Sequence, residues 1–480
     1  MNEPGLDVRD LVICDQAGKS VVRDVNLTVQ RGQALVIIGE SGSGKSLIAL
    51  ALLGLLPPGF TAAGTIRLAG GPPADLADRE ALHRHWSRDI ILLPQEPRAA
   101  LDPTMRIGRQ LAGANHDPRA ALAAVDLPAA SARLYPFELS GGMAQRALVA
   151  SALSQPSPVV VVDEPTKGLD SARVGQVAAL LGMLLNERRS LLVITHDPAL
   201  VRTLGGSVAV LWDGRIVENQ ASPQLLRTPL HPYTREWLAA DPATWAACVP
   251  CLTEEGLVLA GHGLGFGYPG QPRLFDGVDI HVHRGGVVAL TGPSGVGKTS
   301  LGNMLVGLCR PDTGELTWDG ADPYRDRRAM QRLRRRYQKL HQDPVTAFLP
   351  HRPVGRQLAD LAEVAPQLDL AASLPPLLDR LKLDARLLDH YPGEISGGEA
   401  QRLALARLLL LDPAMIVADE PTSRLDPVLQ RQTIALLREI VAERQIGLVL
   451  ISHETALVHS VADHVINIGP CAISRSSVGV

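Results

Sequence analysis

Gly39-Glu40-Ser41-Gly42-Ser43-Gly44-Lys45-Ser46 is the most informative stretch of this 480-residue chain. It follows the apolar run Ala34 to Ile38 and precedes a helix-like stretch, Leu47 to Leu56. A strand, a glycine-rich turn and a helix in this order surround an anion with backbone N–H groups and the positive end of the helix. We therefore predict a phosphate-binding loop built by Gly39, Ser41, Gly42, Gly44, Lys45 and Ser46. Lys45 would reach the β- and γ-phosphates of a nucleotide, and the Ser46 hydroxyl would bind Mg²⁺.

The same motif occurs a second time, as Gly292-Pro293-Ser294-Gly295-Val296-Gly297-Lys298-Thr299, after another apolar run. The corresponding site residues are Gly292, Ser294, Gly295, Gly297, Lys298 and Thr299. Later landmarks also recur about 250 positions further on, which indicates that a whole domain is duplicated. The predicted organisation is a first domain at 1–240, a linker at 241–255 and a second domain at 256–480.

Each copy combines short strands, the phosphate loop, a more helical middle, and a final alternation of strands and helices. This order predicts two α/β domains of the P-loop type, each with a mixed, mostly parallel core sheet and a helical subdomain. Aromatic residues make up only 3% of the chain, so the cores should be aliphatic, as is usual around buried parallel strands.

Composition excludes several classes of function. The formal charge is −3 with acids and bases interspersed, so no basic footprint for nucleic acid is present. The cluster Arg332 to Arg336 is interpreted as a solvated helix face. Five cysteines do not form a disulfide framework, and Cys248 and Cys251 have no second pair with which to complete a metal site. With no secretory signal and no apolar run of ~18 residues, we expect a soluble, cytoplasmic chain.

Two polar elements follow apolar strands in both copies. A glutamine, Gln95 in the first copy and Gln342 in the second, could ligate Mg²⁺ and orient a water molecule. An acid pair ends a later strand, as Asp163-Glu164 and as Asp419-Glu420. The aspartates would hold Mg²⁺, and the glutamates would polarise the attacking water as general bases.

Two more elements complete the repeated set. A strand ends at His196 in the first copy and at His453 in the second, where a histidine could contact a γ-phosphate and sense its loss. Serine and two glycines open a helix at Leu139-Ser140-Gly141-Gly142 and again at Ile395-Ser396-Gly397-Gly398. This is a second anion-binding helix start, and we expect it to cap the nucleotide held by the other copy.

Taken together, these motifs resemble those of ATP-binding-cassette ATPases over nearly the whole chain. The resemblance implies two ATP molecules with Mg²⁺, sandwiched between head-to-tail halves. The first ATP site would combine Lys45, Ser46, Gln95, Asp163, Glu164 and His196 with Ser396 and Gly398. The second would combine Lys298, Thr299, Gln342, Asp419, Glu420 and His453 with Ser140 and Gly142. Both general bases and both histidines are present, so two hydrolysing sites are expected.

Three features depart from the family pattern. The signature sequences continue as Met143-Ala144-Gln145 and Glu399-Ala400-Gln401, where a glutamine usually follows the glycines. Tyr268 is a candidate for stacking on adenine in the second copy, whereas the aligned position in the first copy is Asp15. The loops after the acid pairs also differ, Lys167 to Asp170 against Ser423 to Asp426.

The segments Tyr135-Pro136-Phe137-Glu138, Gly214 to Glu218 and His231 to Arg235 resemble the dipeptide, oligopeptide and nickel importer ATPases. That resemblance implies two transmembrane permease subunits, an extracytoplasmic substrate-binding protein and a location on the cytoplasmic face of the inner membrane. Peptide and nickel or metal-chelate cargo stay open, with a slight preference for the latter. The alternative is a twin cassette in translation or repair, which the short linker and the short spacing from phosphate loop to signature disfavour.

Overall fold

The computed structural model describes residues 3–112, 117–166, 171–248, 256–293, 295–325, 327–423 and 425–469. The chain divides into two compact units, Met1–Leu238 and Ala239–Val480, and each is described by itself. The predicted linker residues up to Cys248 belong to the second unit, where the Cys248 N–H donates to the carbonyl of His459 at 3.0 Å.

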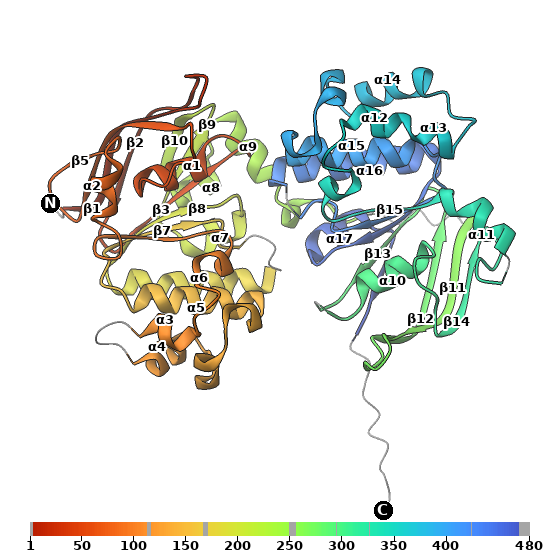
Figure 1. The fold of residues 1–480 in the computed structure, drawn as a ribbon, viewed down its shortest axis with the longest axis horizontal. Helices are drawn as coiled ribbons and strands as arrows, with labels where there is room; N and C mark the ends of the chain where they lie inside the picture. The colour runs from red at the N-terminus through yellow and green to blue at the C-terminus, as the bar shows by residue number, and fades with distance from the viewer. Residues whose placement is uncertain are drawn as a thin grey trace, which may run out of the picture. The chain divides into compact units, whose positions relative to one another are not determined.

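Unit 1 contains two sheets (Figure 1). The antiparallel sheet has the order β2 (Ser20–Gln30), β1 (Pro4–Cys14), β4 (Thr61–Leu68) and β5 (Ala74–Asp75). The larger sheet has the order β10 (Arg215–Ala221), β9 (Ser207–Trp212), β3 (Ala34–Gly39), β8 (Ser190–Ile194), β7 (Val159–Asp163) and β6 (Ile90–Leu93). Its strands are parallel except β10, which pairs antiparallel with β9.

The helices of unit 1 are α1 (Lys45–Leu52), α2 (Arg79–His83), α3 (Ile107–Leu111), α4 (Pro118–Ala124), α5 (Gly141–Leu153), α6 (Ser171–Asn186), α7 (Pro198–Leu204), α8 (Ser222–Arg227) and α9 (Pro232–Ala239). Helix α1 fills the space between the sheets, because Ile48 and Leu52 belong to one core with residues of β1, β2, β3, β7 and β8. This core is aliphatic, as the composition predicts.

The first helix was predicted at Leu47 to Leu56, but α1 begins at Lys45 and ends at Leu52. Its end is closed by two hydrogen bonds, from the Gly54 N–H to the Ala51 carbonyl and from the Leu55 N–H to the Leu50 carbonyl. This is a Schellman ending, and Gly54 supplies the left-handed residue that it needs, with φ of 69°. Apolar periodicity alone does not reveal such a stop.

Unit 2 repeats the plan with smaller sheets. The antiparallel sheet has the order β12 (Phe275–His283), β11 (Leu257–Phe266) and β14 (Thr313–Trp318). The parallel sheet has the order β15 (Tyr337–Leu340), β16 (Met415–Asp419), β17 (Gly447–Ile451), β13 (Val287–Thr291) and β18 (His464–Asn467). Its helices are α10 (Lys298–Leu305), α11 (Arg327–Leu333), α12 (Val354–Ala359), α13 (Leu361–Val364), α14 (Leu370–Arg380), α15 (Gly397–Leu409), α16 (Pro427–Arg444) and α17 (Thr455–Val461).

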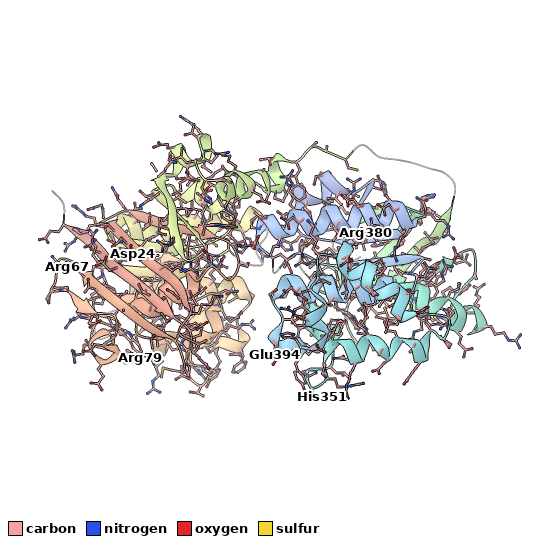
Figure 2. All side chains as sticks on the ribbon, turned by 90° about the horizontal axis from the view of Figure 1, so that it is seen from above. Asp24, Arg67, Arg79, His351, Arg380 and Glu394 are labelled. Carbon is pink, nitrogen blue, oxygen red and sulfur yellow. The ribbon has the colours of Figure 1, made fainter. Side chains whose placement is uncertain are left out.

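The layers of unit 2 are visible in Figure 1, where α10 lies between the two sheets and α12, α13 and α14 gather beside α15. Two cores support this arrangement, and the one around α15 and α16 is mainly aliphatic, as the composition predicts. The core around α10 is not, because it also buries Phe266, Phe275, Trp318 and Tyr337. The Arg332 to Arg336 cluster does not form one helix face as expected, because α11 ends at Leu333 and Arg334–Arg336 form a 3-10 turn. Charged side chains such as Arg67 and Arg79 lie on the outside of unit 1 (Figure 2).

A buried carboxylate fastens α9 to the sheet of unit 1. Glu218, on β10, is 4% exposed and accepts hydrogen bonds from the backbone N–H groups of Leu230 and His231 and from the Thr234 hydroxyl. Burial raises the pKa of Glu218, but these hydrogen bonds and that of Gln220 outweigh burial, so its pKa lies below the ordinary 4.5. Fixing α9 matters, since its Trp237 is fully buried and donates to the His196 carbonyl at 3.0 Å.

We expect Glu218→Gln to lower the free energy of unfolding of unit 1 by about 1–3 kcal/mol at pH 7, since a charged acceptor of several hydrogen bonds is lost. Because the folded-state pKa is depressed, this contribution is present above the ordinary carboxyl range and is lost as the pH falls through the folded pKa. Urea unfolding followed by tryptophan fluorescence at pH 7 and near pH 4 checks this. Glu236→Gln, on the exposed face of α9, is the control; an equal loss in both variants would contradict the prediction.

Candidate functional site

Strand register brings the candidate residues of each unit to one edge of its parallel sheet. In unit 1, Ile194 of β8 pairs with Ile37 of β3 and with Asp163 of β7, so the phosphate loop, the acid pair and His196 all leave the sheet at one edge. In unit 2, Ile451 pairs with Leu290 and with Asp419 in the same way. The carboxyl ends of parallel strands are the usual place for a ligand in such sheets.

Both phosphate loops contain two glycines with positive φ, a conformation that glycine adopts easily. Gly42 and Gly44 have φ of 84° and 97°, and Gly295 and Gly297 have φ of 83° and 107°. A Cβ on Gly44 would lie 2.8 Å from Val22 Cγ2, so this position also lacks room for a side chain. A Cβ on Gly42 would meet nothing within 4 Å, so the space beside the loop is open at this position.

The two lysines fold over these loops. Lys45 is 8% exposed, and its Nζ donates to the carbonyls of Gly39 at 2.8 Å and Glu40 at 2.7 Å. Lys298 Nζ donates to the carbonyls of Gly292 at 2.8 Å and Pro293 at 3.0 Å. Each ammonium group is therefore held at the loop where phosphate oxygens would bind. Ser294, also predicted to bind phosphate, lies outside the described residues.

In each unit, two of the three donors predicted for Mg²⁺ lie together. Ser46 Oγ is 3.2 Å from Asp163 Oδ1, and Thr299 Oγ1 is 3.4 Å from Asp419 Oδ1. A hydroxyl and a carboxylate are hard oxygen donors, and together with phosphate oxygens and water they fit the octahedral preference of Mg²⁺. The glutamine candidates, Gln95 and Gln342, follow β6 and β15 and have exposed side chains.

Each general-base candidate is paired with the histidine of its own unit. His196 Nδ1 lies 2.8 Å from Glu164 Oε2, and His453 Nδ1 lies 2.8 Å from Glu420 Oε1. The sequence predicts that these glutamates and histidines follow strand ends, but it does not predict the contact between them. Both glutamates adopt left-handed backbone conformations, with φ of 48° and 50°. Such backbone is unfavourable for a residue with a side chain, and it turns the glutamate out of the strand direction.

The environment of His196 favours its charged form. Burial lowers the pKa of this imidazole, but the hydrogen bond and the negative charge of Glu164 outweigh burial, so the pKa is raised above 6.5. A protonated histidine beside a carboxylate holds that carboxylate in the charged form that a general base requires.

The signature serines cap helices α5 and α15. Ser140 Oγ accepts from the Met143 N–H at 3.3 Å, and Ser396 Oγ accepts from the Glu399 N–H at 3.4 Å. Glu399 also reaches back to the Ser396 N–H at 3.1 Å, which completes a capping box that the first copy lacks. A Cβ on Gly142 would meet nothing within 4 Å, whereas one on Gly398 would lie 3.4 Å from Leu429 Cδ1.

The adenine-stacking candidate Tyr268 and the aligned residue Asp15 have different surroundings. Tyr268 is 50% exposed, stands edge-on to Phe266 and has its hydroxyl 3.1 Å from Ser300 Oγ, which leaves ring surface for a base. Asp15 Oδ1 accepts hydrogen bonds from the N–H groups of Ala17 and Lys19 at 2.9 Å, so this side chain stabilises the turn between β1 and β2.

Three further sequence candidates can be placed only in part. The first-copy loop 167–170 and Arg424 of the second lie outside the described residues, as does Cys251. Cys248 Sγ accepts from Arg438 Nη2 at 3.3 Å and lies 3.8 Å from Asp463 Oδ1.

Comparison with known proteins identifies the family. Residues 22–167 and 275–423 match the ABC transporter family. The chain belongs to this family. It is a fused tandem of two ABC ATPase domains, and proteins of this kind bind ATP with Mg²⁺ and hydrolyse it.

Similar proteins span nearly the full chain. The peptidoglycan transport ATP-binding protein YejF of Agrobacterium fabrum is 34% identical, over 97% of this chain and 91% of its own. The glutathione import ATP-binding protein GsiA of Escherichia coli is 32% identical, over 94% and 82%. The solved structure of RNase-L Inhibitor has a TM-score of 0.64 at 20% identity, covering 97% of this chain and 91% of that one, so it shares the tandem α/β fold.

Among the residues that the structure describes, no helix combines the length and the apolar character needed to cross a membrane.

We predict that His196 titrates above pH 6.5 in the nucleotide-free protein and that Glu164→Gln lowers its pKa, because burial then acts without the opposing carboxylate. A raised histidine pKa means that the pair stabilises unit 1 fully below about 6.5, and that this contribution is lost as the pH rises through the raised pKa. NMR titration of ¹³C-histidine-labelled protein measures it. Glu187→Gln removes a carboxylate that is 46% exposed and serves as the control. A His196 titration unaffected by Glu164→Gln would show that the pair does not set it.

Proposed function

We propose that this chain is the ATP-hydrolysing motor of an importer, with two active ATP sites. The observation that supports it best is that both units hold the same set in the same geometry: a lysine over the phosphate loop, a hydroxyl beside an aspartate, and a glutamate paired with a histidine. A unit kept only for scaffolding would have no need for a general base held in a strained conformation.

In the proposed mechanism, Lys45 and Lys298 bind the terminal phosphates, and Ser46, Asp163, Thr299 and Asp419 hold Mg²⁺. Bound Mg²⁺ neutralises charge on the transferring phosphoryl group. Glu164 and Glu420 polarise the attacking water, while His196 and His453 orient these carboxylates. Gln95 and Gln342 would complete the metal shell when the loops that carry them move toward the nucleotide.

We further propose that the two halves pair head to tail. Ser396 and Gly398 would then cap the ATP bound at Lys45, and Ser140 and Gly142 would cap the ATP bound at Lys298. Support comes from the helix starts themselves, since the capped N-termini of α5 and α15 offer free backbone N–H groups to an anion. Binding of ATP would close the halves, and hydrolysis would let them reopen.

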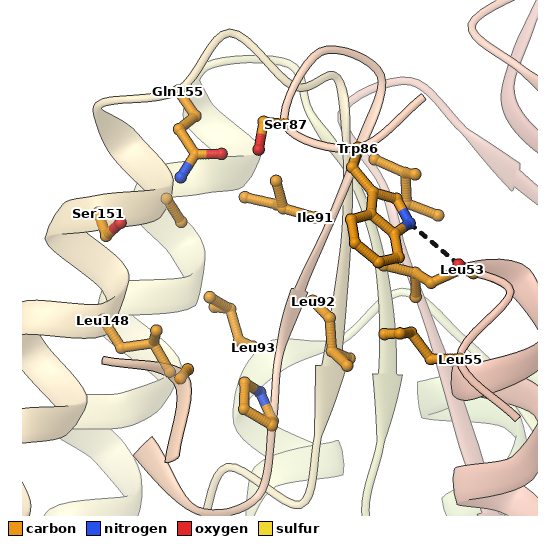
Figure 3. A pocket seen from close by; sticks show the side chains of 14 residues that line it. Leu53, Leu55, Trp86, Ser87, Ile91, Leu92, Leu93, Leu148, Ser151 and Gln155 are labelled. Carbon is orange, nitrogen blue, oxygen red and sulfur yellow. Dashed lines mark hydrogen bonds between the residues drawn. The ribbon is translucent and has the colours of Figure 1, made fainter. Parts of the chain in front are cut away.

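The permease contact in unit 1 is proposed at a groove of about 410 Å³ beside Pro94, the residue before Gln95 (Figure 3). Leu55 and Trp86 form one side of the groove and are 40% and 39% exposed. The Trp86 indole N–H donates a hydrogen bond to the Leu53 carbonyl at 2.9 Å, which holds the ring in place. Leu148 and Ser151 of α5 line the opposite side, so the helix that Ser140 caps also borders the groove.

An amphipathic helix of a permease fits a groove lined by both apolar and polar residues, since it presents both kinds of side chain. Pressure on α5 would move the signature serine at its start, which links permease movement to ATP binding. The partners would be two permease subunits together with an extracytoplasmic substrate-binding protein, and the chain would lie on the cytoplasmic face of the inner membrane.

For the cargo we propose small peptides. The names of the two relatives described above contain peptidoglycan transport and glutathione import, and both substrates contain peptide bonds. The nickel or metal-chelate cargo favoured at first by the sequence has no support among these relatives. A role in translation is the weaker alternative, because it rests only on fold likeness, at 21% identity, to a solved structure that contains an archaeal ribosome recycling factor.

Glu164→Gln and Glu420→Gln are each expected to lower ATP turnover by about 10²-fold or more, since each removes one general base and the two sites work as a pair. Turnover is measured as phosphate release from the purified chain, alone and with its permeases in lipid. Equal losses support two coupled hydrolysing sites. Retention of most activity in either variant would restrict hydrolysis to the other site, and a wild type inactive even with permeases would refute the motor.

Leu55→Asp is expected to weaken binding of the permease subunits by about tenfold or more, because it places a charge at the rim of an apolar groove. Surface plasmon resonance with permeases in nanodiscs measures the affinity. Leu230→Asp is the matched control, because Leu230 is 66% exposed and does not line the groove. An equal effect of both substitutions, or none from Leu55→Asp, would remove the groove as the contact.

A further inference from the structure

The second unit contains a lysine inside its candidate Mg²⁺ site. Lys339 lies on β15, and its Nζ donates to Asp419 Oδ2 at 2.8 Å and to Asn303 Oδ1 at 2.9 Å. The side chains of Lys339 and Asp419 are each 8% exposed, so this is a buried ion pair. The other oxygen of Asp419 lies 3.4 Å from Thr299, the hydroxyl expected on the metal. The ammonium group and the metal would thus share one carboxylate.

The first unit has leucines at the positions equivalent to Lys339 and Asn303. Lys339 pairs with Val417 of β16, two residues before Asp419, and the residue in that register position in unit 1 is Leu92, which pairs with Val161 two residues before Asp163. Asn303 is the sixth residue of α10, and the sixth residue of α1 is Leu50. Leu50 and Leu92 are partly buried and pack on the core of unit 1. A lysine and an asparagine in one copy therefore stand against two leucines in the other.

We propose that Lys339 is a built-in cation that lowers the dependence of the second ATP site on Mg²⁺. The inference rests on the assignment of Asp163 and Asp419 to Mg²⁺ made above, and does not depend on import or on the cargo. With the metal absent, the Asp419 carboxylate would repel the phosphates of ATP, and the ammonium group of Lys339 offsets that repulsion. With the metal present, the same ammonium group repels Mg²⁺ and competes for the carboxylate.

The offset repulsion without Mg²⁺ and the competition with Mg²⁺ both make ATP binding at the second site less dependent on the metal. Mg²⁺ should strengthen ATP binding at the second site less than at the first, by a factor of about ten, within the usual range of coupling between two ligands. Dividing the affinity of one site with Mg²⁺ by its affinity without Mg²⁺ also cancels the effect of having Tyr268 in one copy and Asp15 in the other, because the adenine contact is the same in both conditions.

The test uses the full chain carrying Glu164→Gln and Glu420→Gln, so that ATP is not consumed. Photolabelling with 8-azido-ATP is titrated in excess Mg²⁺ and in EDTA, and peptide mass spectrometry assigns the label to each half. For each half, the readout is the half-saturating concentration in EDTA divided by that in excess Mg²⁺. Measuring this ratio needs no catalytic activity. The wild-type arrangement is expected to give a ratio about tenfold smaller in the second half than in the first.

The decisive variant is Asn303→Leu with Lys339→Leu, which gives the second half the leucine pair that already folds in the first. In this variant the ratio measured for the second half should rise until it equals the ratio measured for the first half. An unchanged ratio would overturn the inference. The reciprocal variant, Leu50→Asn with Leu92→Lys, should lower the ratio of the first half. It decides the matter by itself if the former variant does not fold.

Asp163→Asn and Asp419→Asn separate this inference from the site assignment. If neither changes the ratio of its own half, the aspartates do not hold Mg²⁺, and both the assignment and the inference fail. If both aspartate variants reduce the ratio while the leucine and lysine exchanges have no effect, the Mg²⁺ site stands and only the role of Lys339 is wrong.

Discussion

The fixed register of parallel strands is the constraint on which both candidate sites depend. Strand β8 pairs with β3 on one side and with β7 on the other, and the pairings put Ile37 and Asp163 beside the same residue, Ile194. A shift of one residue would turn every side chain of a strand to the opposite face. The strands are buried on both faces by aliphatic side chains, so such a shift would leave large apolar areas unpacked. The position of the acidic residues therefore follows from the packing of Val159 to Val162.

This rigid sheet also explains how an unfavourable backbone can persist at the glutamates. A left-handed conformation costs about 1–3 kcal/mol for a residue with a side chain. In unit 1 the Glu164 N–H still donates to the Ile194 carbonyl at 2.8 Å, and in unit 2 Glu420 makes the equivalent bond to Ile451 at 2.9 Å. The ladder thus continues one residue past the strand while the side chain turns toward the histidine. Stability of the core offsets local strain at the site.

Sequence patterns predicted those parts of the site that depend on short spacing. The phosphate loops, the acid pairs and the histidines each follow an apolar run directly, so a few neighbouring residues suffice to place them. The contact of Lys339 with Asp419 joins residues 80 positions apart and depends on which strand lies beside β16, which no local pattern gives. The one available signal was a lysine inside the short strand Tyr337–Leu340, both of whose ends are buried. Similarly, the hydrogen bonds of Glu218 and Trp237 join elements whose proximity only the fold determines.

The two copies show where a duplicated site can diverge without losing its chemistry. Among the side chains expected at phosphate, Mg²⁺ and the attacking water, a serine replaces a threonine and every other member is identical. The copies differ at residues beside these side chains. Met143 of the first copy corresponds to Glu399 of the second, and Leu92 corresponds to Lys339. Because a charge two contacts from a phosphate still acts on it in a buried site, such neighbours can change affinity while the reacting groups stay in place. Asymmetry in how the halves bind phosphate and Mg²⁺ should therefore be sought in these outer residues, and the buried ion pair of Lys339 contacts an expected metal ligand directly.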